Sequence, residues 1–302
     1  MIEWLVYWFM FPACIGIVSF AMMLGIDGTA ILTPSVILLF PLLSVPTVSP
    51  AQAVTVGLFT EFFGFLSGVL GYRTQGLIDY KVGIRLAAFA VPTIVAASLL
   101  AQFSPALFLK LAFGVLMVGL AVYLSVTAKT TVRDSHLSAV PPSVESIPRK
   151  NESDDETVIR TASGDEYRYR VCDRTRGELV CAVGSAFEGM ISVGLGELVM
   201  PDLVRRCKIP ISVSAATSVF VMAVAVFAGS VTGMLSLAAR GGASSLPWNL
   251  LLFTVPGAVI GGQVGSRAQG VLSSLTMERL IVVIFAIIGV SFLYVSTTGL
   301  VR

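Results

Sequence analysis

The chain has 302 residues, of which 55% are hydrophobic and 13% are charged. Soluble domains carry about 25% charged residues, so this composition excludes an ordinary soluble globule. The net charge of +2 gives no electrostatic basis for nucleic-acid binding. Apolar stretches of about 20 residues, long enough to cross the ~30 Å hydrocarbon core of a bilayer as helices, recur along the sequence. We therefore expect an all-α, polytopic membrane protein embedded in a lipid bilayer.

Five hydrophobic segments precede a charged stretch. They span 4–24, 29–44, 50–71, 82–102 and 107–126. The first segment lacks the basic region of a signal peptide, so we expect it to be retained. The connection between the first two segments is nearly absent, and the second is broken by Pro34 and Pro41. This pair is predicted to form a short or re-entrant helical hairpin whose tip, 25–34, lies near the middle of the membrane.

Residues 127–178 interrupt the apolar pattern with 9 basic and 10 acidic side chains, which is half of all 38 charges. This segment must lie in water. Its first part, with several prolines and the Asp154-Asp155-Glu156 run, is typical of a disordered linker. In its second part, residues 157–161 and 167–171 flank a Ser-Gly-Asp turn, and the alternation in the latter predicts a small β-hairpin.

Five more hydrophobic segments follow, and their features recur in the same order as in the first five. They span 179–194, 197–207, 211–238, 247–268 and 276–299. The Gly25-Ile-Asp-Gly28 break corresponds to the Gly194-Leu-Gly-Glu197 break, and each is followed by a proline. We infer a duplication. It divides the chain into an N-terminal repeat (1–126), the charged loop (127–178) and a C-terminal repeat (179–302).

Because each repeat has an odd number of segments, the second should enter the membrane from the opposite side. The fold is thus predicted to contain two inverted repeats. If each segment returns the chain across the membrane, one face receives eight basic residues and the other receives three. This bias places the first face and the long loop in the cytoplasm, with both termini outside. The eight are Arg73, Lys81, Arg85, Arg205, Arg206, Lys208, Arg267 and Arg279, and the three are Lys110, Arg240 and Arg302.

The two glycine-rich tips are predicted to bind a small anion. Glycine lets the backbone turn sharply, and a helix that restarts there offers free N–H groups with about half a positive charge. Since no Lys or Arg lies deep inside a segment, amides and hydroxyls would bind the anion. The candidate substrate-binding residues are Gly25, Asp27, Gly28, Thr29, Gln52, Thr55, Gly194, Gly196, Glu197, Thr217 and Ser218. The alternative is that the glycines serve only close helix packing.

Four acidic side chains lie inside the apolar segments, where each costs roughly 2.5–3.5 kcal/mol unless it faces protein or water. Asp27 and Glu197 lie at the tips, where they either cap the restarting helices or compete with an anionic substrate. Glu61 and Glu188 lie within segments and are candidates for proton coupling. Their alternative role is a structural hydrogen bond between helices.

The sequence indicates no cofactor. The four cysteines lack C-x-x-C spacing, and the one histidine, His136, lies in the polar loop. We therefore expect neither a metal site nor a disulfide framework.

The two tips carry a recognisable pattern. Residues 25–34 read G-I-D-G-T-A-I-L-T-P, and residues 194–201 read G-L-G-E-L-V-M-P; Thr55 follows the first tip and Ala216-Thr217-Ser218 the second. This order resembles the TauE/SafE sulfite exporter family, whose halves each carry a G-I-G-G-G-x-L-L-x-P element and then an A-x-x-T-S element. The chain departs from that pattern at Asp27 and Thr29, which replace glycines, at one residue missing from the second tip, and at Val56.

The resemblance implies export of sulfite, or of a small organosulfonate such as sulfoacetate, through a central site enclosed by the two repeats. We therefore predict a transporter that works by alternating access, with proton coupling through Glu61 or Glu188. A channel, or an importer of another small anion, is the alternative. An intramembrane enzyme is disfavoured because no nucleophile or metal motif is present, and a scaffold built on the charged loop is a further alternative. A homodimer is compatible with a compact membrane protein of this size.

Overall fold

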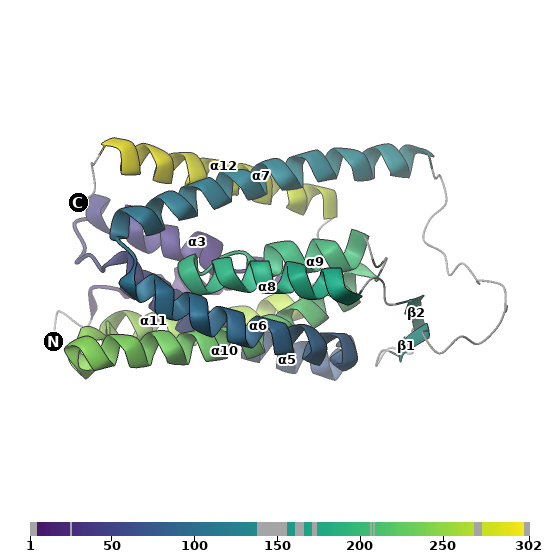
Figure 1. Ribbon diagram of the computed structural model, residues 1–302, viewed down its shortest axis with the longest axis horizontal. Helices are drawn as coiled ribbons and strands as arrows, with labels where there is room; N and C mark the ends of the chain where they lie inside the picture. The colour runs from purple at the N-terminus through teal and green to yellow at the C-terminus, as the bar shows by residue number, and fades with distance from the viewer. Residues whose placement is uncertain are drawn as a thin grey trace.

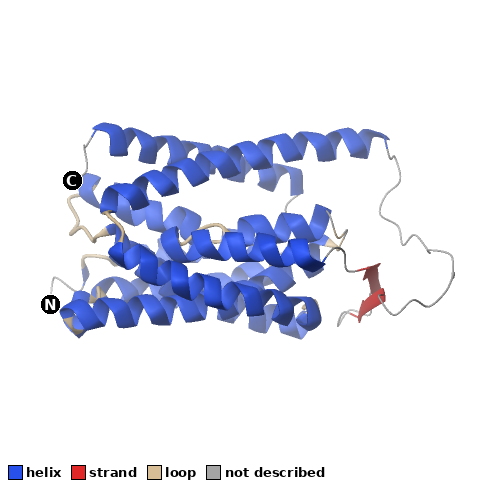
Figure 2. Ribbon diagram, viewed as in Figure 1, coloured by secondary structure: helices blue, strands red, loops and turns tan. Residues whose placement is uncertain are grey.

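The computed structural model describes residues 5–24, 26–137, 156–160, 166–170, 174–205, 207, 209–268 and 274–298. Helices dominate these residues, and a two-stranded hairpin lies beyond one end of the helical bundle (Figures 1 and 2). Five of the described helices are long and apolar enough to cross a membrane. The described residues are therefore mostly helical and are consistent with an all-α membrane protein, which the composition predicts.

The first half begins with a broken helical hairpin where the sequence predicts one. Helix α2 (Met10–Leu24) turns into α3 (Thr29–Pro34), which continues through a π-helical turn, η1 (Ser35–Leu39), into α4 (Phe40–Leu42). Pro34 lies where the helix widens, because proline removes one N–H from the regular hydrogen-bond ladder. Three long helices follow, α5 (Pro50–Gln75), α6 (Tyr80–Phe103) and α7 (Ala106–Leu137).

The charged loop is structured at both of its ends. Helix α7 extends to Leu137, although its apolar part ends at Val126, the predicted end of the segment. The rest of the predicted linker, 138–155, lies outside the described residues. Strands β1 (Glu156–Arg160) and β2 (Glu166–Arg170) form the expected antiparallel hairpin, in a register that pairs Glu156 with Arg170. The predicted turn at 163–165 is also outside the described residues.

The second half repeats the order of the first. It consists of α8 (Arg174–Ile191), the short α9 (Leu195–Arg205), α10 (Ile211–Gly241), α11 (Trp248–Arg267) and α12 (Ser274–Thr298), with a 3₁₀ turn, η2 (Ala243–Ser245), before α11. Helix α9 has only eleven residues, which is too short to cross a bilayer core. It therefore forms, with α8, a second hairpin like that of α2 and α3.

Helices of each half pack against helices of the other half. Helix α2 packs on α11 of the second half, and α8 packs on α6 of the first half, while α5 packs on α10 and α7 on α12. Glycines allow the closest of these approaches. A Cβ atom at Gly257, Gly261 or Gly265 of α11 would come within 3.0 Å of a backbone carbonyl oxygen of α2. Small residues at this four-residue spacing let two membrane helices pack backbone to backbone.

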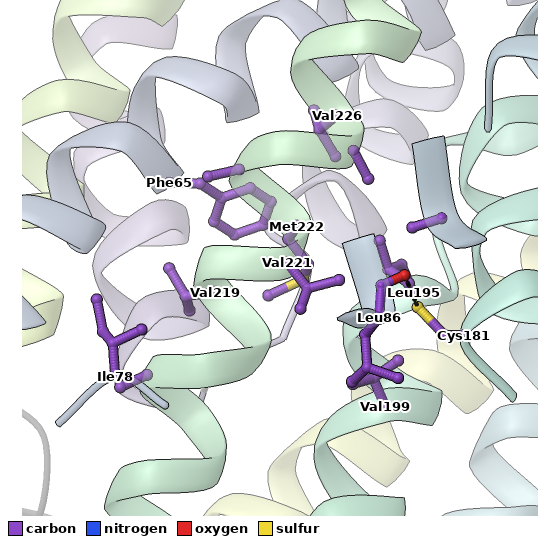
Figure 3. Close-up of a cluster of buried hydrophobic side chains, with 14 of the residues drawn as sticks. Phe65, Ile78, Leu86, Cys181, Leu195, Val199, Val219, Val221, Met222 and Val226 are labelled. Carbon is purple, nitrogen blue, oxygen red and sulfur yellow. Dashed lines mark hydrogen bonds between the residues drawn. The ribbon is translucent and has the colours of Figure 1, made fainter. Parts of the chain in front are cut away.

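A buried apolar cluster joins α5, α6, α8, α9 and α10. Figure 3 shows Phe65, Leu86, Leu195 and Met222 in this cluster, with the Cys181 thiol donating a 3.4 Å hydrogen bond to the Leu86 carbonyl oxygen. Cluster residues fill the space directly beside the second hairpin tip. The core therefore fixes the position of the tip within the bundle.

Two cysteines, Cys14 and Cys181, are free and buried. Cys207, just after α9, is disulfide-bonded. From the sequence, no disulfide framework was expected, and this bond was not predicted. A disulfide depends on the distance between two side chains in the fold, which the spacing of cysteines along the sequence does not reveal.

Candidate functional site

The tips of the two helical hairpins lie against each other inside the protein. In the structure, the turn of the first tip spans residues 26–28 between α2 and α3, and the turn of the second tip spans residues 192–194 between α8 and α9. A Cβ atom at Gly196 would lie only 3.0 Å from the Ile26 Cα atom, so the two backbones are nearly in contact. The backbone N–H of Asp27 donates to Glu197 Oε1 at 3.4 Å. The structure thus brings together residues that are about 170 positions apart in the chain.

The sharp turn of the second tip requires glycine. Gly194 has φ +133°, a conformation that side chains with a Cβ atom rarely adopt. Ser192, two residues earlier, is also in the left-handed region with φ +55°. Backbone strain at such positions persists only where the surrounding structure enforces it, and it is common at functional sites.

The backbone N–H groups at the start of α9 donate hydrogen bonds to the carboxylates of three residues. Asp27 Oδ2 accepts hydrogen bonds from Gly194 N at 3.2 Å and Gly196 N at 3.1 Å, and Glu197 Oε2 accepts from Gly194 N at 3.1 Å. Glu188 Oε2 accepts from Leu195 N at 3.3 Å. These are the N–H groups that a helix N-terminus leaves without partners and that favour negative charge. The acids therefore take the place that the sequence analysis assigned to a substrate anion.

At the start of α3, a single acid accepts the corresponding hydrogen bonds. Glu61, from the middle of α5, accepts from Thr29 N at 3.1 Å through Oε1 and from the Thr29 hydroxyl at 2.7 Å through Oε2. Both oxygens of Glu61 are therefore engaged by one residue. The proton-coupling candidate Glu61 and the substrate-binding candidate Thr29 form a single unit.

The four acids form one buried cluster. Asp27, Glu61, Glu188 and Glu197 are each at most 2% exposed. Asp27 and Glu197 both accept from the Gly194 N–H, and Glu188 accepts from the next amide, the Leu195 N–H, so these three carboxyl groups lie close together. Asp27 Oδ1 and Glu188 Oε1 have no hydrogen-bond donor among the described residues. Two carboxyl groups this close are stable when they share a proton or a cation, since two buried negative charges repel each other strongly.

Three of these acids could also hold a cation. One oxygen from each of Asp27, Glu61 and Glu188 lies within 4.8 Å of the others. The hydrogen-bond partners described above for the cluster are backbone amides and one hydroxyl, so they leave its negative charge uncompensated. Protons on the carboxyl groups, or one bound cation, would compensate that charge.

A hydroxyl pair between the tips was not predicted. Thr33 Oγ1 and Ser192 Oγ lie 2.9 Å apart and share a hydrogen bond. Both face Gly57 of α5, where an added Cβ atom would lie 2.8 Å from Thr33 Oγ1. Thr33 follows Thr29 by four residues, so the two threonines lie on one face of the helix that restarts at the first tip. This spacing was the signal in the sequence that could have identified Thr33.

Other predicted site residues form hydrogen bonds away from the tips. Gln52 and Ser49 form a capping box at the start of α5, and Gln52 Nε2 donates to the Ser245 carbonyl oxygen. Thr55 Oγ1 accepts from Gln102 Nε2, and Thr217 Oγ1 accepts from the backbone N–H of Asp79. The structure thus places these three residues in contacts with other helices.

Two predicted residues stand apart from this pattern. Ser218 is fully buried, and its Oγ atom has no hydrogen-bond partner among the described residues. This buried hydroxyl of α10 could therefore donate or accept a further hydrogen bond. Gly25, at the first tip, lies outside the described residues.

A cavity of about 350 Å³ lies between the ends of α5 and α11, away from the tips. Its lining consists of Leu70, Gly71, Thr74, Gln75, Gln263 and Arg267. The tips themselves are closely packed, as the contact of Gly196 with Ile26 shows. The structure thus describes a conformation in which the acid cluster is shut off from solvent.

The family model described as "Sulfite exporter TauE/SafE" matches residues 10–292. The chain belongs to the TauE/SafE family. It is also 22% identical over 274 residues to the "Probable membrane transporter protein YunE" of Bacillus subtilis (strain 168), covering 90% of this chain and 92% of that protein. No solved structure matches the chain significantly.

TauE/SafE membership and this relative make the protein a membrane transporter. The resemblance noted in the tip motifs is thereby confirmed at the level of the family. The TauE/SafE match extends from the first described turns of α2 to near the end of α12, so it includes both tips and all four buried acids.

Proposed function

We propose that the protein exports a small sulfur-containing anion, sulfite or an organosulfonate such as sulfoacetate, through a site at the two tips. The observation that carries this proposal is a set of buried backbone N–H groups at the starts of α3 and α9 that donate hydrogen bonds to carboxylates. Oxygen atoms of a carboxylate and of a sulfonate or sulfite make the same kind of hydrogen bond to an N–H group. Sulfite is named in the description of the matching family, and sulfoacetate is proposed as an anion of the same chemistry.

The acids would compete with the substrate for these amides. While Asp27 and Glu61 are ionised, their oxygens accept from the N–H groups and exclude an anion. A protonated carboxyl group is a weaker acceptor and can rotate to donate its own hydrogen, which leaves the amide free. Proton binding to the cluster would therefore precede anion binding. A proton and the anion would then be bound in the same state of the transporter.

Alternating access gives a simple account of the two halves. We propose that they are inverted repeats, a relationship that the crosswise packing of α2 on α11 and of α8 on α6 supports. In transporters of this type, one repeat rocks against the other around a site near the middle of the membrane. The tips lie where the two repeats meet, so such a motion would expose them to one side and then to the other.

We propose that the hairpin end of the bundle faces the cytoplasm. Helix α7 ends at the same end of the bundle as the β-hairpin, and α12 ends at the opposite end (Figure 1). The last turns of α5 and α11 carry Arg73 and Arg267. Basic residues gather on the cytoplasmic side of membrane proteins, and both termini would then lie outside.

A substrate panel in proteoliposomes tests this function. Purified protein is reconstituted, and flux of sulfite, sulfoacetate, thiosulfate and sulfate is compared at two opposite pH gradients. The proposal predicts saturable flux of sulfite or sulfoacetate that exceeds flux in protein-free vesicles and changes with the direction of the pH gradient. Absence of flux for all four anions would contradict the proposed substrate class.

A further inference from the structure

The β-hairpin of the charged loop docks on the helical bundle through one face. In the observed register, Ile159 lies opposite Tyr167, and Tyr169 is two residues further along β2, so these three side chains share a face. That face packs on the apolar cluster that contains Ile78 and Leu203. Val158, on the other face of the hairpin, is 44% exposed. The hairpin thus has one side for the protein and one for solvent.

Tyr169 is the centre of this contact. It is only 6% exposed, and its hydroxyl donates a 2.6 Å hydrogen bond to Asp79 Oδ2. Burial, and then the hydrogen bond with Asp79, raises the pKa of the Tyr169 phenol, so the hydroxyl keeps its proton and remains a donor. Hydrogen bonds to charged groups are among the stronger ones in proteins.

Asp79 connects the hairpin to both halves of the transporter. Its Oδ1 atom caps α6 by accepting from the backbone N–H groups of Lys81 and Val82. Its own backbone N–H donates to the hydroxyl of Thr217 on α10 at 3.0 Å. Helix α6 belongs to the first half and α10 to the second. One residue therefore joins the loop hairpin, the first half and the second half at the same end of the bundle.

We infer that the docked hairpin is a latch that holds this end of the transporter closed, an inference that rests on the proposed function. A two-stranded hairpin is marginally stable by itself, so its order depends on the surface to which it docks. A motion that separates the α5–α6 connection from α10 must break the contact between Asp79 and Thr217. The hairpin packs on the apolar cluster to which Leu77 and Ile78 of this connection belong, and Tyr169 bonds to Asp79, so opening at this end requires the hairpin to loosen as well.

The test removes one hydroxyl and follows amide hydrogen exchange in the purified full-length protein. Tyr169→Phe deletes the donor to Asp79 and keeps the ring, while Tyr167→Phe is the matched control on the same face of β2. We expect Tyr169→Phe to raise exchange about fivefold or more in residues 76–82 and in the tip residues 192–196, because a hydrogen bond to a charged group is lost. Tyr167→Phe is expected to leave both regions within about twofold of the unmodified protein.

The same variants are then assayed for anion flux in proteoliposomes. A latch predicts faster flux for Tyr169→Phe than for Tyr167→Phe. Exchange at the tips that is equal in the two variants would overturn the latch, and so would faster exchange at 76–82 without any change at 192–196. The exchange measurement needs no substrate, so a failure of the proposed function would leave it readable. Faster tip exchange in a protein that moves none of the tested anions would uphold the latch and reject the substrate.

Discussion

Glu61 and Thr29 form the most completely bonded pair at the tips, since both oxygens of one carboxylate are used by one residue. Replacing Glu61 by Gln keeps one acceptor oxygen but removes the group that can take up a proton. We predict that Glu61→Gln lowers anion flux and makes the remaining flux independent of pH between about 6 and 8. Flux is measured in proteoliposomes at symmetrical pH values across that range.

The control for this prediction is Glu178→Gln. Glu178 forms an ion pair with Arg85 between α8 and α6, and it lies near the start of α8, whereas the second tip follows the end of that helix. Its loss should leave the pH dependence of flux unchanged. A Glu61→Gln variant with the pH dependence of the unmodified protein would show that Glu61 is only a structural hydrogen-bond acceptor.

The glycines of the tips differ in how much space surrounds them. A Cβ atom at Gly196 would lie 2.6 Å from Met222 Sδ and 3.0 Å from the Ile26 backbone, whereas at Gly28 the nearest atom would be Ala21 Cβ at 3.4 Å. We therefore predict that Gly196→Ala reduces flux at least about tenfold, because the tips must move apart. Gly28→Ala should retain most of the flux, and equal losses in the two variants would contradict this geometry.

At the scale of elements, the pairing of α2 with α11 depends on small residues. Gly261 of α11 faces the backbone of α2, where a Cβ atom would lie 2.9 Å from the Ile15 carbonyl oxygen. We predict that Gly261→Val destabilises the protein by about 1–3 kcal/mol, because overpacking forces the helices apart. Thermal unfolding in detergent measures the effect. Gly16→Val is the control, since nothing lies within 4 Å of an added Cβ atom there, and an equal loss of stability in both variants would contradict the packing argument.

Most elements of this fold could be predicted from the sequence because each carries a local signal. Apolar length predicts the long helices, and the Gly-rich breaks predict both broken hairpins, including the eleven-residue α9. The extension of α7 to Leu137 was missed because charged residues there are compatible with either a loop or a solvated helix. The cap at Ser49 and Gln52 does have a sequence signature, which is a serine followed three residues later by glutamine.

The bonding at the tips could only be predicted in part. The acids were identified because ionisable side chains are rare inside apolar segments, and the tip glycines because they lie at the breaks between two such segments. Their partners were not, since Asp27 bonds to Gly196, 169 residues away, and such pairs depend on the packing of the two halves. Thr55 and Thr217 match a family motif, yet the structure gives them hydrogen bonds to Gln102 and Asp79. A motif marks a position in the chain without fixing which neighbour it meets.

For the molecule as a whole, the proposed topology can be tested directly. We predict that a cysteine placed in the charged loop reacts with a membrane-impermeant thiol reagent only after the cells are opened. A cysteine placed before α2 or after α12 should react in intact cells. The physical reason is the excess of basic residues that the sequence analysis assigns to the face carrying the charged loop. Labelling of the loop in intact cells would reverse the orientation and contradict the proposed topology.

The central claim is that proton uptake by the buried acids frees the tip amides for an anion. The most direct test is to record proton movement with a pH-sensitive dye while a sulfoacetate gradient drives flux through reconstituted protein, in buffers with and without sodium. The sulfonate group stays ionised, so it carries no proton itself. The account predicts that protons move in the same direction as the anion, without any need for sodium, and that Asp27→Asn and Glu61→Gln abolish this movement. Anion flux without proton movement, or flux that requires sodium, would contradict it.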